Sequence, residues 1–210
     1  DRVPADADLV IIGNPTNPTG VLHPRSTLDA LRAPGRVLVI DEAFMDAIVG
    51  GADSLISADL DGVIVVRSLT KTWGLAGLRA GYVVGDPSLL RLLAEQQPHW
   101  SVSSLAARAS VAVCAPAARA EEAELAREAA TWRHHLVRGL QSLGLAPVPG
   151  AAPFVLVRVG PGVHGSLRER GYAVRRGDSF PGLDDDWVRL AVRDPHTTDG
   201  LLRELQSLLG

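Results

Sequence analysis

Cysteine is almost absent from this sequence: Cys114 is the only one among 210 residues. A single cysteine excludes an internal disulfide framework and is typical of a reducing compartment, so we expect a cytoplasmic protein. The neighbours of Cys114 are small and apolar, from Val111 to Pro116. They predict a buried and unreactive thiol rather than a nucleophile.

Strong charge of one sign and long apolar runs are also lacking. The formal net charge is −3 at pH 7, and no apolar run approaches the length that crosses a bilayer. We therefore expect neither nucleic acid nor a membrane as a partner. Residues 1–6 have neither the basic start nor the apolar middle of a signal peptide, and no initiator methionine is present. A strand pattern begins almost at once, which suggests that the chain continues a larger fold.

Hydrophobic residues make up 46% of the sequence, enough for a substantial core. In the first part of the chain, short apolar runs typical of buried strands alternate with helical patterns. Continuous apolar strands joined by crossovers indicate a mostly parallel sheet, so we predict an α/β fold. The predicted strands are residues 8–12, 36–41, 62–67 and 81–84.

The pattern changes in the last third of the chain. Two alanine-rich helices are predicted at residues 103–114 and 116–143. The later segments alternate between strands and helices, with strands at 154–158, 172–175 and 187–192 and helices at 165–170 and 198–209. This indicates a small C-terminal α+β domain. A boundary inside the long helix gives predicted domains at residues 1–125 and 126–210.

Two segments place polar side chains directly after predicted strands. Asn14–Gly20 contains two prolines and a glycine, which hold the Asn17 amide at the carboxyl edge of the sheet, where open α/β sheets bind ligands. Asp41 ends the next strand, where a buried carboxylate needs a cationic partner such as a protonated pyridine nitrogen. Each segment alone is equally consistent with a structural role, as a rigid turn or a helix cap.

The third segment, Ser68–Gly81, combines hydroxyls, glycines and an arginine. The hydroxyls of Ser68 and Thr70 and the guanidinium of Arg79 describe a phosphate cradle. Lys71 lies among them between apolar flanks, which suits a lysine nucleophile activated by burial and a neighbouring cation. The alternative is a surface lysine in a glycine-rich loop, which the apolar flanks disfavour.

The order of these motifs resembles the fold-type-I pyridoxal-phosphate (PLP) aminotransferases. The match runs through Asn-Pro-Thr-Gly, Asp-Glu-Ala, Ser-x-x-Lys and an arginine eight residues after the lysine. It is closest to the branch of histidinol-phosphate aminotransferase and threonine-phosphate decarboxylase. The resemblance implies PLP as the cofactor, no metal, and Lys71 as the catalytic Schiff-base lysine. The other cofactor ligands that it implies are Asp41 for the ring nitrogen, Asn17 for the ring 3-hydroxyl, and Ser68, Thr70 and Arg79 for the phosphate.

The resemblance also implies how a substrate is bound. Arg189, on the last predicted strand, matches the arginine that forks onto the substrate α-carboxylate. Arg175, with Arg176 as second choice, matches the arginine that holds a substrate phosphate, so we expect a small phosphorylated amino acid or amine as substrate. Trp100 is expected to line the pocket entrance. The structural alternatives are a solvated strand edge for the arginines and a core position for Trp100.

Two features favour the decarboxylase within this branch. Phe44 stands where many aminotransferases have a tyrosine, and residues 97–103 resemble the decarboxylase pattern. We therefore expect decarboxylation of L-threonine O-3-phosphate in cobalamin biosynthesis, with a histidinol-phosphate-type aminotransferase as the alternative. The resemblance implies a homodimer as well. It also implies a large N-terminal part that these residues lack, so a truncated non-catalytic fragment is the second alternative.

Overall fold

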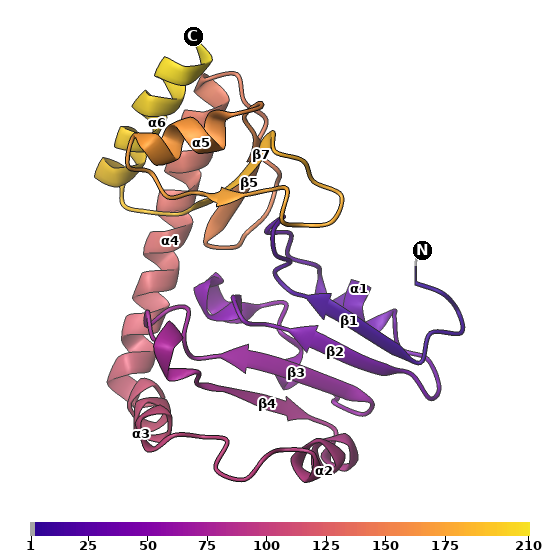
Figure 1. Ribbon diagram of the computed structural model, residues 1–210. Helices are drawn as coiled ribbons and strands as arrows, with labels where there is room; N and C mark the ends of the chain where they lie inside the picture. The colour runs from indigo at the N-terminus through magenta and orange to yellow at the C-terminus, as the bar shows by residue number, and fades with distance from the viewer. Residues whose placement is uncertain (1–2) are drawn as a thin grey trace. The chain divides into compact units, whose positions relative to one another are not determined.

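The protein is described here from a computed structural model, in which residues 3–210 are placed. Asp1 and Arg2, the start of the stretch compared with signal peptides, lie outside the described residues. The chain forms two compact units. One contains the residues up to Pro15 together with Leu22–Ala126, and the other contains Thr16–Val21 and Arg127–Gly210. Helix α4 (Pro116–Ser142) is continuous and contributes residues to both (Figure 1).

A four-stranded sheet forms the centre of the first unit (Figure 1). Its strands follow the chain order: β1 (Leu9–Gly13), β2 (Val37–Asp41), β3 (Val63–Ser68) and β4 (Gly81–Gly85). Strands β1 to β3 are parallel, whereas β4 returns antiparallel to β3. The connection from β3 to β4 holds only the short 3₁₀ turn η4 (Ala76–Leu78) instead of a crossover helix, which accounts for the reversal. The prediction of a mostly parallel sheet is confirmed.

Helices and 3₁₀ turns complete the first unit. They are α1 (Arg25–Asp29), η1 (Met45–Ala47), η2 (Val49–Gly51), η3 (Leu55–Ser57), α2 (Pro87–Glu95) and α3 (Ser104–Val113). Asp86 caps α2 by accepting from the Ser88 amide, and Ser103 caps α3 by accepting from the Ala106 amide. The buried core under the parallel strands consists of Val10, Leu28, Leu38, Ile40, Leu55, Val63 and Val65.

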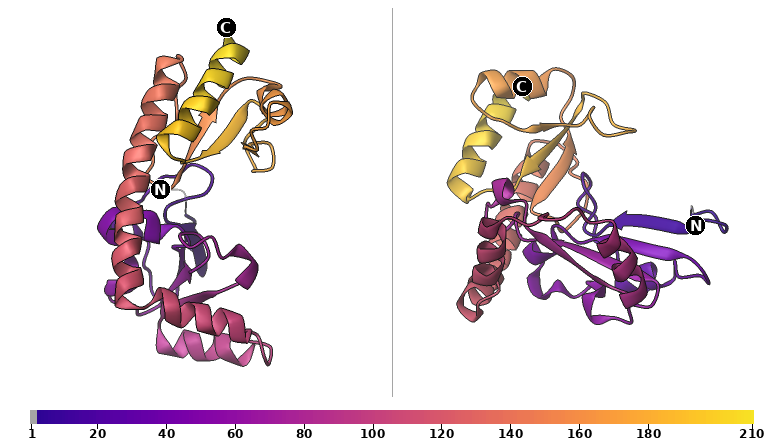
Figure 2. Two further views of the ribbon diagram at one scale, coloured as in Figure 1. Left: turned by 90° about the vertical axis from the view of Figure 1, so that its left-hand side faces the viewer. Right: turned by 60° about the horizontal axis from the view of Figure 1, so that its bottom comes forward.

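The second unit has a three-stranded antiparallel sheet in the order β5-β7-β6. Its elements are β5 (Phe154–Arg158), α5 (Val163–Glu169), β6 (Arg175–Arg176), β7 (Trp187–Ala191) and α6 (Pro195–Leu209). Helices α4 and α6 lie side by side (Figure 2). A Cβ atom on Gly139 of α4 would lie 2.2 Å from a Leu202 methyl of α6, so this glycine permits the close approach.

Two predictions about single segments are wrong. The strand expected at residues 172–175 is observed only at Arg175–Arg176, because Tyr172 and Val174 pack against the hydrophobic core of the second unit and Arg175 and Arg176 pair with β7. Cys114 is exposed instead of buried, since it is the C-cap of α3 and the preceding Val113 takes the buried position. Within residues 3–210, no helix combines the length and apolar character needed to cross a membrane.

The loop Thr16–Val21 packs with the second unit although its flanks belong to the first. Gly20, with φ +76°, donates its amide to the Thr16 carbonyl at 2.7 Å and accepts from the Ala151 amide at 2.7 Å. A Cβ atom on Gly150 would lie 2.5 Å from the Gly20 carbonyl oxygen, so two glycine backbones touch at this point. This contact fixes the loop that carries Asn17.

Candidate functional site

The carboxyl ends of the parallel strands gather several of the predicted site residues at one edge of the sheet. Gly13 pairs with Asp41, and Asp41 pairs with Val66, two residues before Ser68. The ladder continues past the strand ends, because the Glu42 amide donates to the Val66 carbonyl at 2.9 Å. Asp41 and the segment that begins at Ser68 therefore share the edge at which open α/β sheets bind ligands.

A cavity of about 230 Å³ opens at this edge. It is lined by Arg67, Ser68, Thr70, Arg79, Ala80 and Gly81, so the three residues of the predicted phosphate cradle meet in one space. The hydroxyl oxygens of Ser68 and Thr70 lie 2.8 Å apart. Hydroxyls and a guanidinium around a small cavity are donors suited to a phosphate group.

Arg79 adopts a left-handed backbone conformation, with φ 52°. It ends the 3₁₀ turn η4, and its Nη1 donates to the Ala76 carbonyl at 3.1 Å. A side-chain-bearing residue in this conformation costs on the order of 1 kcal/mol, and such strain is concentrated at functional sites. The conformation points to a local role for Arg79, consistent with its place on the cavity wall.

Lys71 is the only lysine in the chain; the other basic residues counted with it are arginines. It is exposed, so the burial expected from its apolar flanks is not present. Its Nζ lies 5.4 Å from the centre of the Phe44 ring, three residues after Asp41. Asp41 is exposed too, and one of its oxygens accepts from the Ala43 amide at 3.0 Å. This is a local turn bond and not the helix cap weighed as its alternative, because the N-cap of the next helical turn, η1, is Phe44.

The second unit holds the predicted substrate arginines. Arg175 on β6 pairs directly with Arg189 on β7. Arg189 donates from Nη1 to the Asn17 side-chain oxygen at 2.5 Å, and its guanidinium carbon lies 4.7 Å from the centre of the Phe154 ring. Burial lowers the pKa of Arg189, and the charge of Arg175 lowers it further. Two adjacent guanidinium groups can receive two anionic groups of one small molecule.

The structure separates Arg175 from Arg176 by their partners. Arg176 donates from Nε to an Asp178 carboxylate oxygen at 2.5 Å. Arg175 instead lies over the Phe180 ring, with 5.4 Å between its guanidinium carbon and the ring centre. Because Arg176 is neutralised by its own carboxylate and Arg175 faces Arg189, the arrangement favours Arg175 as the anion ligand.

Two residues with structural importance for the site escaped the sequence analysis. Asn14 is fully buried, donates to the His23 carbonyl at 3.2 Å and accepts from the His23 amide at 2.7 Å. These two bonds join the ends of the loop between Asn14 and His23, which contains Asn17. Arg67 lines the cavity beside Ser68. The available signal was the presence of polar residues at the ends of otherwise apolar strands.

Trp100 is not among the residues that line the cavities found at the two edges of the sheet. Its side chain is 97% exposed, its φ is 62°, and it is absent from the lining of the cavities described here. Its place at a pocket entrance stays a prediction.

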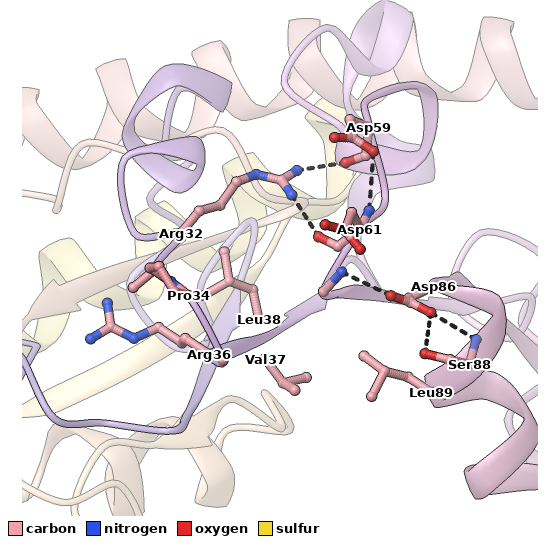
Figure 3. A pocket seen from close by; sticks show the side chains of 13 residues that line it. Arg32, Pro34, Arg36, Val37, Leu38, Asp59, Asp61, Asp86, Ser88 and Leu89 are labelled. Atoms are coloured by element: carbon pink, nitrogen blue, oxygen red, sulfur yellow. Dashed lines mark hydrogen bonds between the residues drawn. The ribbon is translucent and has the colours of Figure 1, made fainter.

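A larger cavity of about 550 Å³ lies at the opposite edge of the sheet, where β2 begins (Figure 3). Its arginines are already engaged: Arg32 donates to the Asp59 and Asp61 carbonyls, and Arg36 donates to four main-chain carbonyls of residues 4–31. These groups fasten loops, which leaves the smaller cavity as the better candidate. Across residues 3–210, no cluster of three or more metal-ligating side chains is present.

A parallel sheet with a lysine loop at its carboxyl edge, followed by a small α+β unit, defines a recognisable class of protein. The chain belongs to the class I and II aminotransferase family, whose model matches residues 1–207. The resemblance noted from the sequence motifs is thereby confirmed.

Two relatives illustrate the range within the family. A histidinol-phosphate aminotransferase of Mycobacterium tuberculosis is 51% identical over 194 residues, which cover 91% of this chain and 53% of that protein. The threonine-phosphate decarboxylase of Salmonella typhimurium is 32% identical over 223 residues, which cover 97% of this chain and 58% of that protein. The chain thus spans a little over half the length of these relatives.

Solved structures show the same fold. The histidinol-phosphate aminotransferase of Sinorhizobium meliloti, solved in complex with pyridoxal-5'-phosphate, has a TM-score of 0.82 and 26% identity, with 97% of this chain and 57% of that chain covered. The histidinol-phosphate aminotransferase of Clostridium acetobutylicum has a TM-score of 0.85 at 24% identity, with 96% and 64% covered.

Proposed function

We propose that this chain carries the cofactor site of a PLP-dependent enzyme acting on a small phosphorylated amino acid or amine. One observation carries the proposal. The chain's single lysine lies at the carboxyl edge of the sheet, in the same segment as the hydroxyl-lined and guanidinium-lined cavity. Family membership and the PLP complex of the Sinorhizobium relative support it.

The residues at this edge fit the cofactor by their chemistry. Ser68, Thr70 and Arg79 would donate to the phosphate, and the Asp41 carboxylate would hold a proton on the pyridine nitrogen. The Lys71 amine would attach the cofactor and then carry protons at the reacting carbon. When bound, PLP supplies a ring that draws electrons from that carbon.

Asn17, Arg189 and Arg175 are proposed to complete the recognition. The Asn17 amide can donate to the ring 3-hydroxyl while its oxygen accepts from Arg189. Arg189 would fork onto the substrate carboxylate, which suits a planar guanidinium, and Arg175 would pair with the substrate phosphate. A partner subunit is expected from the family resemblance, and we propose a homodimer.

Transamination of a histidinol-phosphate-type substrate is the reaction that the relatives favour, because a 51% identical protein carries that name. In transamination, Lys71 would take the proton from the substrate Cα and return it elsewhere on the cofactor–substrate pair. Such an enzyme needs a 2-oxo acid as amino acceptor.

Decarboxylation of L-threonine O-3-phosphate, within cobalamin biosynthesis, is the second candidate, and Phe44 favours it. Phe44 lies beside Lys71 and has no hydroxyl to offer the cofactor, unlike the tyrosine common in aminotransferases. In this reaction the Cα–carboxylate bond breaks, carbon dioxide leaves, and Lys71 would return a proton to Cα. The Salmonella relative carries this name at 32% identity.

The test begins with cofactor binding. The purified chain would be mixed with PLP, its absorbance spectrum recorded, and the mixture reduced with borohydride before peptide mapping. We expect an absorption band that reduction removes, with label on Lys71, since the only other amine in the chain is its N-terminus. Lys71→Arg keeps the positive charge but cannot be labelled, and serves as the matched control.

The same preparation then separates the reactions. Product formation from histidinol phosphate that depends on added 2-oxoglutarate supports transamination. Carbon dioxide release from threonine phosphate without any 2-oxo acid supports decarboxylation. An unaltered chain that shows no band and no label contradicts the proposed function and favours a non-catalytic fragment.

A further inference from the structure

Arg67 is a nearly buried arginine next to the candidate phosphate cavity. It lies one residue before the end of β3 and is directly followed by Ser68. Its side chain is only 10% exposed, and all three guanidinium nitrogens donate hydrogen bonds. Nε donates to a Glu42 oxygen at 2.9 Å, Nη2 donates to the Ser54 hydroxyl at 3.0 Å, and Nη1 pairs with the Asp46 carboxylate.

The main partner of Arg67 is fixed in turn. The Glu42 side chain is fully buried, with 0% exposed. One Glu42 oxygen accepts from the Ser54 hydroxyl at 2.7 Å as well as from Arg67, and the other accepts from the Leu55 amide at 2.8 Å. Both Glu42 oxygens are therefore hydrogen-bonded. If the Glu42 carboxylate or the Arg67 guanidinium moved, its buried partner would be left unpaired in a low-dielectric environment, which is costly.

This network connects the two strand ends that carry the cofactor residues. Glu42 directly follows Asp41 at the end of β2, and Arg67 directly precedes Ser68 at the end of β3. Arg67 is also the one residue common to two cavities, the 230 Å³ cavity with Ser68 and Thr70 and a 340 Å³ cavity with Asp46 and Ser54. Arg67 therefore borders both cavities.

We propose that Arg67 is a positioning residue of the cofactor site. Its bonds to Glu42 and Asp46 fix the spacing between Asp41, at the end of β2, and the Ser68–Lys71 segment, which begins at the end of β3, so that a ring nitrogen and a phosphate of one cofactor can be held together. The inference rests on the proposed function for its ligand. In this role Arg67 contacts no substrate and moves no proton.

A matched control exists in the same unit. Arg32 also donates through three nitrogens, from Nε to an Asp29 carboxylate oxygen at 3.1 Å and from its two Nη atoms to the Asp61 and Asp59 carbonyls. It lies at the opposite edge of the sheet (Figure 3). Arg32→Lys removes a comparable three-bond anchor without touching the carboxyl edge, because lysine lacks the planar fork.

The experiment compares Arg67→Lys with Arg32→Lys in the full chain by three measurements. Thermal unfolding reports how much each substitution destabilises the fold. Hydrogen exchange of the cofactor-free chain reports how well residues 68–75 are ordered. Within this segment the Leu75 amide donates a hydrogen bond to the Thr70 carbonyl. Titration with PLP reports cofactor affinity.

Arg67→Lys is expected to speed exchange of residues 68–75 and weaken PLP binding, each by about tenfold or more. Arg32→Lys is expected to change both by less than about twofold, when each variant is measured at the same number of degrees below its own melting temperature. Equal effects of the two variants on exchange and affinity would overturn the positioning role, since destabilisation alone would then account for them. An unaltered chain that fails to bind PLP would overturn the proposed function and the assignment of a cofactor to this edge. Unchanged exchange in Arg67→Lys would overturn the inference alone.

Discussion

Arg175 and Arg189 lie directly opposite each other on the antiparallel strands β6 and β7. Like charges in this arrangement repel, and the pKa of Arg189 is lowered partly by the charge of Arg175. Asn17 and the Phe154 ring hold Arg189 in place, while Phe180 supports Arg175. The repulsion between the two guanidinium groups is relieved when an anion lies between them. We therefore expect the pair to act as an anion receptor rather than as a stabilising element.

Inorganic phosphate should therefore stabilise the protein through this pair. We expect phosphate to raise the melting temperature of the unaltered chain by more than it raises that of Arg175→Gln. Arg176→Gln is the matched control, because Arg176 is already paired with Asp178. Thermal unfolding at constant ionic strength, with chloride replaced stepwise by phosphate, measures the difference. A phosphate response equal in all three proteins would show that the arginine pair binds no anion.

The Thr70 hydroxyl is expected to contribute to cofactor affinity. Thr70 is buried, lines the 230 Å³ cavity and lies within 2.8 Å of the Ser68 hydroxyl. Thr70→Val keeps the shape but removes one donor to a charged phosphate, a bond worth roughly 1.5–3 kcal/mol. PLP binding should weaken by about tenfold or more. Thr72→Val, two residues along and outside the cavity lining, should leave the dissociation constant unchanged. A similar loss in both variants would contradict the cradle.

Asn14 should hold the loop that carries Asn17. Its two bonds to His23 are buried, so Asn14→Ala is expected to cost about 1–3 kcal/mol of folding free energy. Asn14→Asp keeps the acceptor for the His23 amide and removes the donor, which should give an intermediate loss. Thermal unfolding orders the three proteins, and limited proteolysis should cut the alanine variant first within residues 15–22. Cleavage elsewhere with this loop intact would show that the bonds between Asn14 and His23 do not hold the loop.

The strands of the first unit could be predicted closely because their signal is local. Each predicted strand up to Gly85 lies within one residue of the observed one at both ends. Continuous β-branched runs bounded by glycine and proline leave little freedom of assignment. The positions of Asp41 and Ser68 could be predicted for the same reason, since each stands at the end of such a run. One local signal was not used: Lys71 is the only lysine among the 21 lysine and arginine residues.

The remaining features depend on contacts between segments far apart in the chain. The cross-strand pair of Arg175 and Arg189 requires a register that no local pattern supplies, and the short β6 was placed too early for that reason. The packing of Thr16–Val21 with the second unit depends on the approach of Gly20 to Gly150, 130 positions later. The partners of Arg67 come from a turn at Asp46 and Ser54 whose path the sequence leaves open.

Glu122 should make stability fall as the pH rises through the acid range. The residue is buried on α4, where it accepts from Arg119 at 2.7 Å. Burial raises its pKa above the ordinary value of 4.5, the charge of Asp46 raises it further, and Arg119 and Arg67 oppose the change.

The sign of the effect follows from proton binding. Between the ordinary value and the raised pKa, the folded chain holds a proton that the unfolded chain has lost, so raising the pH favours unfolding in this window.

Glu122→Gln keeps the neutral shape and removes this dependence. The melting temperature of the variant minus that of the unaltered chain should therefore increase from pH 4 to pH 7. Asp86, whose pKa is lowered by hydrogen bonds from Ser88 and Gly62, loses stabilisation in acid in both proteins, so its contribution cancels in the difference. Glu121→Gln, on the neighbouring exposed position, is the matched control for the loss of one carboxylate from α4. If both variants give the same pH-independent difference, the raised pKa of Glu122 has no part in the pH response, and the buried carboxylate must be ionised in the folded chain as readily as in the unfolded one.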